Sequence, residues 1–157
     1  MTEINVEVNG LRFDESVPAR LLLSDFLRQQ LRLTGTHVGC EHGVCGSCTI
    51  LLEGVAVRSC LMLAVQVDGA SIRTVESLAS GEHLHPLQEE FRRAHALQCG
   101  FCTPGILMAS VDFLGRNPNP SRAEITDMLS GQLCRCTGYT PIVDAIEQAA
   151  ARLQGAE

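Results

Sequence analysis

The stretch Gly39-Cys40-Glu41-His42-Gly43-Val44-Cys45-Gly46-Ser47-Cys48 decides how the first half of the chain folds. Its three cysteines and Cys60 are spaced C-x4-C-x2-C-x11-C, which is the pattern of a plant-type [2Fe–2S] site. The three glycines of the loop tolerate positive φ, so that the chain can wrap tightly and turn backbone N–H groups toward sulfur. The stretch therefore predicts a cluster on a first quartet, Cys40, Cys45, Cys48 and Cys60.

Zinc on the same four cysteines is the alternative, because structural zinc sites also use cysteines two to four residues apart. A loop so rich in glycine is unusual for zinc and favours the cluster. His37 and His42 flank the loop. We expect both to be solvated loop histidines, since four cysteines already complete a set of ligands.

A second quartet follows, with the spacing C-x2-C-x31-C-x-C: Cys99, Cys102, Cys134 and Cys136. Cys102 directly precedes Thr103-Pro104, and a few residues after Cys136 comes Thr140-Pro141. Both dipeptides are typical of helix starts. Helix N-termini favour thiolates and negatively charged clusters, so this placement predicts a second [2Fe–2S] cluster. Zinc is the main competitor here, and C-x2-C alone would also suit a redox dithiol.

The first half of the chain has the character of a small sheet. Ile4, Val6 and Val8 alternate with polar residues, which predicts a half-buried strand, and Asn9-Gly10 predicts a hairpin turn after it. Further elements are expected as a returning strand over 11–17, a helix over 22–31, a hairpin over 49–57 and a last strand over 72–75.

The second half has the character of helices. Pro86, Thr103, Ser121 and Thr140 are expected to begin four of them, and Ser121 to Glu124 has the pattern of a capping box. Residues 76–85 are a plausible linker. We therefore expect an α+β fold with a [2Fe–2S] domain over 1–75 and a helical [2Fe–2S]-binding domain over 76–157.

Composition and charge narrow the classes of function. A net charge of −6 argues against nucleic acid as a partner, and 45% hydrophobic residues are enough for a packed core. Neither a membrane-spanning run nor an N-terminal signal pattern is present. We therefore expect a cytoplasmic protein, in which cysteines are more useful as metal ligands than as disulfides.

Two segments resemble a known family: Gln98-Cys99-Gly100-Phe101-Cys102-Thr103-Pro104-Gly105 and Leu133-Cys134-Arg135-Cys136-Thr137-Gly138-Tyr139. They are similar to the two signatures of the iron–sulfur subunit of the xanthine oxidase, or molybdenum hydroxylase, family, and the loop from Cys40 to Cys48 matches that family too. The resemblance implies a plant-ferredoxin-like β-grasp domain followed by a four-helix bundle. It also implies that Gln98 and Cys136 lie against a molybdenum–pterin cofactor.

The resemblance further implies the partners. These are a large molybdenum subunit, with the cofactor in its cytosine-dinucleotide form, and a medium FAD subunit, assembled as a dimer of heterotrimers. Electrons would leave the pterin, pass the second quartet and then the first, and reach FAD or an external acceptor. The hydroxylated substrate, an aromatic N-heterocycle, an aldehyde, a purine or carbon monoxide, would bind in another chain, so no catalytic residue is expected here. The alternatives are a free ferredoxin-type carrier and a zinc-stabilised interaction module.

Overall fold

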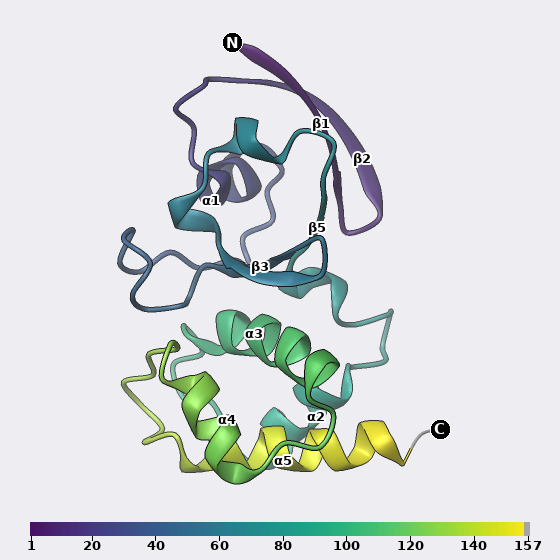
Figure 1. The fold of residues 1–157 in the computed structure, drawn as a ribbon, viewed down its shortest axis with the longest axis vertical. Helices are drawn as coiled ribbons and strands as arrows, with labels where there is room; N and C mark the ends of the chain where they lie inside the picture. Colours follow the sequence, from purple (N-terminus) through teal and green to yellow (C-terminus); the bar gives the residue numbers. More distant parts are fainter. Residues whose placement is uncertain (156–157) are drawn as a thin grey trace.

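A computed structural model describes residues 1–155. Figure 1 shows a sheet-containing half that holds the N-terminus and a helical half that holds the C-terminus. Strand β1 (Thr2–Val8) pairs with antiparallel β2 (Leu11–Val17) through the predicted Asn9-Gly10 turn. Asn9 and Gly10 have φ of 54° and 80°, as a tight hairpin turn of this kind requires.

A mixed sheet of five strands in the order β2-β1-β5-β3-β4 forms the first half. Strands β3 (Thr49–Leu52) and β4 (Val55–Arg58) make the second hairpin, and β5 (Ser71–Arg73) lies parallel to β1 and antiparallel to β3. The last strand was expected at 72–75. It ends earlier because Val75–Ser77 forms the short 3-10 turn η4.

The helix expected over 22–31 is not a regular α-helix. Its first turn, α1 (Leu23–Asp25), passes into a π-helical turn, η1 (Phe26–Gln30), in which Leu31 N donates to Phe26 O at 3.1 Å. Leu23, Phe26 and Leu27 are fully buried against the sheet. The helical character of this segment was therefore predicted, but not the wider turn.

Five α-helices occur in the part of the chain that the structure describes: α1 and then α2 (Pro86–Arg93), α3 (Thr103–Arg116), α4 (Arg122–Leu129) and α5 (Thr140–Gln154). All four predicted starts in the second half are confirmed to within one residue. The capping box is present, because Ser121 N donates to a Glu124 carboxylate oxygen at 2.7 Å and Glu124 N donates to Ser121 Oγ at 3.3 Å.

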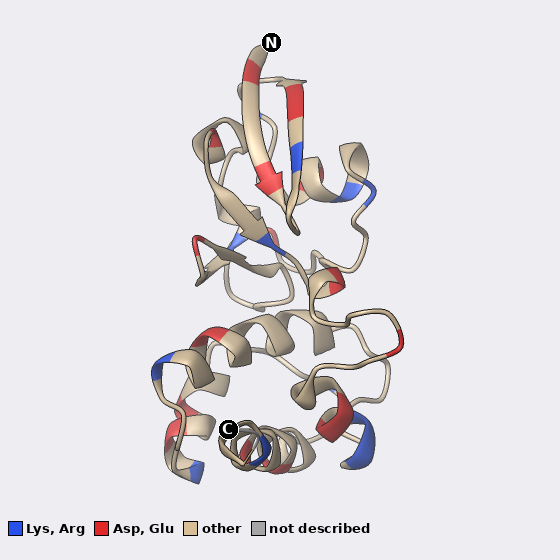
Figure 2. Ribbon diagram, turned by 90° about the vertical axis from the view of Figure 1, so that its right-hand side faces the viewer, with Lys and Arg blue, Asp and Glu red and all other residues tan. Residues whose placement is uncertain are grey.

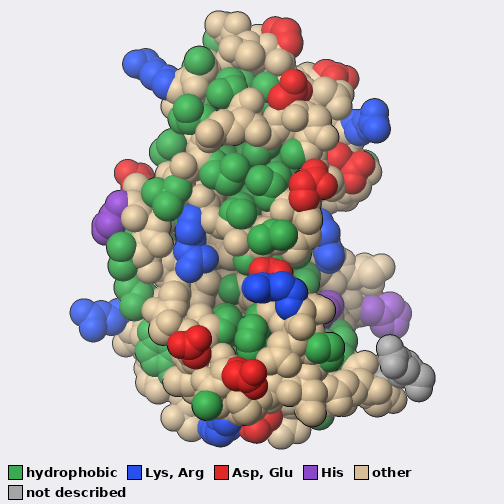
Figure 3. All heavy atoms as spheres, in the orientation of Figure 1, with side chains coloured by type: hydrophobic (Ala, Val, Ile, Leu, Met, Phe, Trp, Pro, Cys, Tyr) green, Lys and Arg blue, Asp and Glu red, His purple; other side chains and the backbone are tan. Residues whose placement is uncertain are grey.

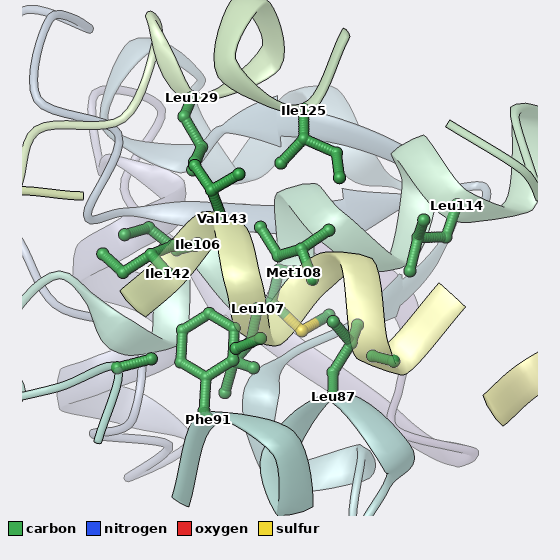
Figure 4. Close-up of a cluster of buried hydrophobic side chains, with 14 of the residues drawn as sticks. Leu87, Phe91, Ile106, Leu107, Met108, Leu114, Ile125, Leu129, Ile142 and Val143 are labelled. Carbon is green, nitrogen blue, oxygen red and sulfur yellow. The ribbon is translucent and has the colours of Figure 1, made fainter. Parts of the chain in front are cut away.

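The helices share an aliphatic core, shown in Figure 4. Side chains from all four of the later helices meet there: Leu87, Phe91, Ile106, Leu107, Met108, Leu114, Ile125, Leu129, Ile142 and Val143. At the edge of this core Arg152 of α5 binds Glu89 (2.5 Å) and Glu90 (2.7 Å) of α2. Acidic and basic residues occur in both halves of the molecule (Figure 2).

Helix α3 joins the two halves, because it packs on the hairpin of β3 and β4. Leu51 of β3 belongs to the helical core. The buried carboxylate of Asp112 accepts from Ala56 N of β4 at 3.1 Å and pairs with Arg116 at 2.9 Å. Hydrophobic side chains gather over the sheet half on the face shown in Figure 3. No helix among the described residues is long and apolar enough to span a bilayer.

Candidate metal centres

The first cysteine loop folds back on itself before β3 begins. Glu41, Gly43 and Gly46 have φ of 57°, 82° and 80°, so the chain turns three times through the left-handed region. These turns bring Cys45 N to 3.4 Å from Cys40 Sγ, as a donor. The loop therefore presents backbone N–H groups to sulfur, which is what its glycine content predicted.

The hairpin of β3 and β4 delivers the last cysteine of the first quartet. Thr49 is paired with Arg58, so the residues just outside the hairpin, Cys48 and Cys60, are brought together. Ser59 closes this end with two hydrogen bonds to Cys48 O, from its backbone N at 3.3 Å and from Oγ at 2.8 Å. Cys48 and Cys60 are both buried.

The thiols of this quartet differ in acidity. Backbone N–H groups of Cys45 and His42 lower the pKa of Cys40 to about 6. Burial, and then the neighbouring Cys48 thiol, raise the pKa of Cys60 to about 11. Cys40 thus favours a thiolate, whereas Cys60 favours the neutral thiol until a positive metal centre is bound.

The second quartet is assembled from two interhelical loops. Cys99 and Cys102 lie between α2 and α3, with Cys102 immediately before the first residue of α3. Cys134 and Cys136 lie between α4 and α5. The loops meet, since Cys136 Sγ is 3.5 Å from Cys99 Sγ, and burial followed by the nearby Cys134 thiol raises the pKa of Cys102 to about 12.

Each quartet consists of two close pairs of thiols. The neighbours are Cys40 with Cys45, Cys48 with Cys60, Cys99 with Cys136, and Cys102 with Cys134. Two thiolates for each of two irons is the ligation of a [2Fe–2S] cluster, so the pairs fit that group. A zinc ion would instead need its ligands round one point. Within residues 1–155 no three His, Cys, Asp or Glu side chains converge in that way.

Comparison with known proteins identifies the family. A 2Fe-2S iron-sulfur cluster binding domain matches residues 6–79, and a [2Fe-2S] binding domain matches residues 74–147. The nicotine 6-hydroxylase small subunit of Paenarthrobacter nicotinovorans is 60% identical over 144 residues, which is 92% of this chain and 87% of that one. This chain belongs to the iron–sulfur small subunits of the molybdenum hydroxylase family.

Two further relatives place the small subunit in the same family. Caffeine dehydrogenase subunit gamma of Pseudomonas sp. (strain CBB1) is 54% identical over 92% of this chain and 88% of its own. The crystal structure of quinoline 2-oxidoreductase from Pseudomonas putida 86 contains a chain that superposes with a TM-score of 0.95, at 52% identity over 99% of this chain and 96% of that one. The resemblance drawn from the cysteine motifs is thereby confirmed, and so is the ferredoxin-like α+β fold.

The two quartets of this small subunit are connected by the segment 132–134. Leu133 N donates to Cys45 O at 2.8 Å. The buried Gln132 amide, oriented so that both of its atoms have partners, donates to Gly46 O at 3.1 Å and accepts from Arg58 at 3.2 Å. The residues next to Cys134 are therefore bonded directly to the loop of the first quartet.

Two glycines allow the loops to come this close. A Cβ on Gly105, in the first turn of α3, would lie 2.3 Å from Gly46 O. A Cβ on Gly46 would lie 2.1 Å from the Gln132 side chain and 2.7 Å from Gly131 O. The helix start and the cysteine loop thus pack backbone to backbone.

His37 was expected to be a solvated loop histidine, and it is only partly so. It is half-buried, its ring stacks on Phe101 with 4.9 Å between centroids, and its Nδ1 lies 2.8 Å from Phe101 O. Phe101 sits between Cys99 and Cys102, so His37 braces the second quartet from the first half of the chain. Its position three residues before Cys40 was the only available hint.

A hollow of about 230 Å³ opens between the quartets, lined by cysteines of both and by Phe101 and Leu133. A larger one of about 320 Å³, beside α2, contains none of the cysteines and is lined by Glu82, Leu84, Glu89, Arg92 and Arg93. The smaller hollow is the candidate functional site, because it is the one lined by cysteine thiols. Gln98 is exposed next to the exposed Cys99, and Arg135, between two cysteines, also lines this hollow.

Tyr139 packs against the helical core just before α5 and also binds the loop that carries Cys134. Its hydroxyl accepts from Cys134 N at 2.8 Å and donates to Gln132 O at 3.1 Å. Its backbone has φ of 71°, which costs a side chain other than glycine about 1–2 kcal/mol. The tyrosine therefore holds the Cys134 loop, a role that sequence position near the cysteines suggested only in general terms.

Proposed function

We propose that this subunit holds one [2Fe–2S] cluster on the first quartet and another on the second, and that it conducts electrons for a molybdenum-dependent hydroxylase. The observation that carries the proposal is the pairing of the thiols, because two pairs in each quartet match the two irons of such a cluster. Backbone donors near the sulfurs and the burial of several ligands are the means by which the chain would tune the cluster potentials.

The division into two domains is part of the proposal. We place the boundary near residue 75, with a β-grasp plant-ferredoxin-like domain over 1–75 and a helical domain over 76–157. The separate apolar cores of the sheet and of the later helices support this division. The shared core of α2, α3, α4 and α5 supports a four-helix bundle as the scaffold of the second quartet.

Gln98 and Cys136 are proposed to face the molybdenum–pterin cofactor of a large partner subunit. Gln98 and the Cys99 paired with Cys136 are exposed, as groups that meet another chain must be. The second quartet would then receive electrons from the pterin, and the first would deliver them to FAD or an external acceptor. The backbone hydrogen bond from Leu133 to Cys45 keeps the two quartets close, which suits electron transfer from the second quartet to the first.

The complex is proposed to contain a large molybdenum subunit, with the cofactor in its cytosine-dinucleotide form, and a medium FAD subunit. We propose a dimer of heterotrimers in the cytoplasm. Names of the relatives support the multi-subunit assembly, since one is called a small subunit and another subunit gamma.

An aromatic N-heterocycle is the substrate class that we propose for the complex. Nicotine, caffeine and quinoline, which appear in the names of three similar proteins, are all nitrogen heterocycles. The substrate would be oxidised at molybdenum in the large subunit, so this chain would supply electron transfer rather than an acid, a base or a nucleophile.

Metal analysis tests the cluster proposal against zinc. The purified chain should contain about four iron and about four labile sulfide, since each cluster has two of each, and its reduced form should give two distinguishable EPR signals. Cys48→Ala and Cys134→Ala should each remove one of the signals, a different one, whereas Ser130→Ala at the exposed end of α4 should keep both. Zinc in place of iron would refute the proposal.

Size-exclusion chromatography of the native protein tests the subunit role against a free ferredoxin-type carrier. A carrier would elute near its own mass of 17.0 kDa. A hydroxylase subunit should elute with a large molybdenum protein and a flavoprotein, and should be reduced when the heterocycle is added. Elution of the red-brown chain alone, from cells that contain the partners, would contradict the subunit role.

A further inference from the structure

The sulfur of Cys134 has an unusual neighbour. Thr137 Oγ1 lies 3.1 Å from Cys134 Sγ, inside the loop between α4 and α5. Cys134 is buried, so water does not compete strongly for its sulfur. Among the residues that the structure describes, this is the one cysteine with a side-chain hydroxyl at hydrogen-bond distance from its sulfur.

The direction of this hydrogen bond follows from the other partner of Thr137. Tyr139 N donates to Thr137 Oγ1 at 3.1 Å, so the hydroxyl oxygen is already an acceptor there. Its hydrogen is free to point to Cys134 Sγ. A cysteine that ligates iron is a thiolate and can only accept, so Thr137 is the donor. The result is a chain, Tyr139 N–H to Thr137 O–H to Cys134 sulfur, in which each bond polarises the next.

Tyr139 holds this chain in place from both ends. Its hydroxyl binds the backbone on either side of Leu133, accepting from Cys134 N and donating to Gln132 O. The backbone of Tyr139 is strained, with φ of 71°, and the N–H group of this same residue donates to Thr137 Oγ1. Strain that the surrounding contacts maintain is common at functional sites.

We propose that Thr137 is a positioning residue whose hydroxyl, held by Tyr139, raises the reduction potential of the cluster on the second quartet. Reduction adds an electron, and much of the added charge lies on sulfur. A hydrogen bond to sulfur therefore stabilises the reduced form more than the oxidised form. This inference rests on the proposed assignment of a [2Fe–2S] cluster to Cys99, Cys102, Cys134 and Cys136.

The test is an EPR-monitored redox titration of the full chain carrying Thr137→Val. The second-quartet cluster should become harder to reduce, with the ratio of reduced to oxidised form falling about threefold to tenfold at a fixed potential, where tenfold is about 59 mV for one electron. The first-quartet signal in the same sample is the internal reference and should titrate as in wild type. Thr137→Ser keeps the hydroxyl and should restore most of the potential.

Thr126→Val is the matched control, because it removes a hydroxyl that bonds only Arg122 O on the exposed side of α4. It should leave both potentials unchanged. If Thr137→Val does not fold, because it puts a methyl group against the sulfur, Thr137→Ala removes the donor without that contact and should lower the potential in the same direction.

Iron content separates the two proposals. An unchanged potential in Thr137→Val or Thr137→Ala, with about four iron still bound, would overturn the role of Thr137 and leave the cluster assignment intact. A wild-type chain that lacks the second EPR signal and half of the iron would overturn the assignment itself. A loss of potential that Thr137→Ser fails to restore would show a structural effect of the side chain rather than a hydrogen bond to sulfur.

Discussion

The amide nitrogen of Leu133 donates to the carbonyl oxygen of Cys45 over 2.8 Å, so a residue next to one quartet is bonded to a member of the other. Gln132 supports this contact from the adjoining position, through Gly46 O and Arg58. Arg58 also donates to Gly131 O at 2.6 Å across 73 positions of the sequence, so the two cysteine loops form one continuous polar joint.

Gln132→Leu should destabilise the chain. The leucine would remove two buried hydrogen bonds, one to Gly46 O and one from Arg58, and at about 0.5–1.5 kcal/mol for each the free energy of unfolding should fall by about 1–3 kcal/mol. Urea denaturation would measure it. Gln148→Leu, at an exposed position of α5, is the control and should change the free energy of unfolding by less than about 0.5 kcal/mol. Equal effects of the two variants would contradict a buried joint at Gln132.

Gly105→Ala and Gly115→Ala lie on the same helix and should act in opposite directions. At Gly105 the new methyl group would meet Gly46 O at 2.3 Å, so the backbones must separate and the free energy of unfolding should fall by about 1–3 kcal/mol. Gly115 has open space around it, and alanine there should raise the free energy of unfolding by up to about 1 kcal/mol. Thermal unfolding of both variants checks the signs, and a neutral Gly105→Ala would disprove the tight contact.

Tyr139→Phe keeps the ring in the helical core but removes the hydroxyl that binds Cys134 N and Gln132 O. Two backbone groups lose their partner, and we expect a loss of about 1–3 kcal/mol in the free energy of unfolding. Amide hydrogen exchange localises the effect: faster exchange at Cys134 is expected, with unchanged exchange in β1 and β2. An unchanged exchange rate at the Cys134 amide would mean that the Tyr139 hydroxyl does not hold this part of the loop.

Arg152→Gln tests the contact between α2 and α5 through its pH dependence. The hydrogen bond from Arg152, and then its charge, hold the pKa of Glu89 below the ordinary 4.5. A lowered carboxyl pKa stabilises the fold above the unfolded value, and the stabilisation is lost as pH falls through the folded value. The gap in free energy of unfolding between wild type and Arg152→Gln should therefore shrink between about pH 6 and about pH 3.

Arg20→Gln, on the exposed stretch after β2, is the reference for that series and should show no such pH-dependent gap. A gap between wild type and Arg152→Gln that stays constant down to about pH 3 would mean that Glu89 is not stabilised by Arg152.

Local patterns predicted the elements well because their causes are local. Alternation of Ile4, Val6 and Val8, the Asn9-Gly10 turn and the capping box of Ser121 each depend on residues a few positions apart. The cysteine spacing likewise indicated which thiols form each quartet. The π-helical turn at Phe26–Gln30 was missed, since apolar spacing barely distinguishes it from an α-helix.

Contacts between the halves could not be predicted in the same way. His37 meets Phe101 across 64 residues, and Leu133 meets Cys45 through backbone atoms that every residue other than proline possesses. Neither contact has a recurring side-chain signature. Gln132 and Tyr139 stand near cysteines, but only the folded chain shows that their polar groups are directed to the backbone of the loops.

The hydrogen bond from Leu133 to Cys45 uses only main-chain atoms, whereas Leu133 as a residue is 48% exposed beside the hollow between the quartets. Substitution there can reshape the surface offered to another protein without severing the link beneath it, and proline is the one natural replacement that removes the amide hydrogen. Substitution at position 133 can therefore change the surface of the small subunit while the hydrogen bond between the two cysteine loops is kept.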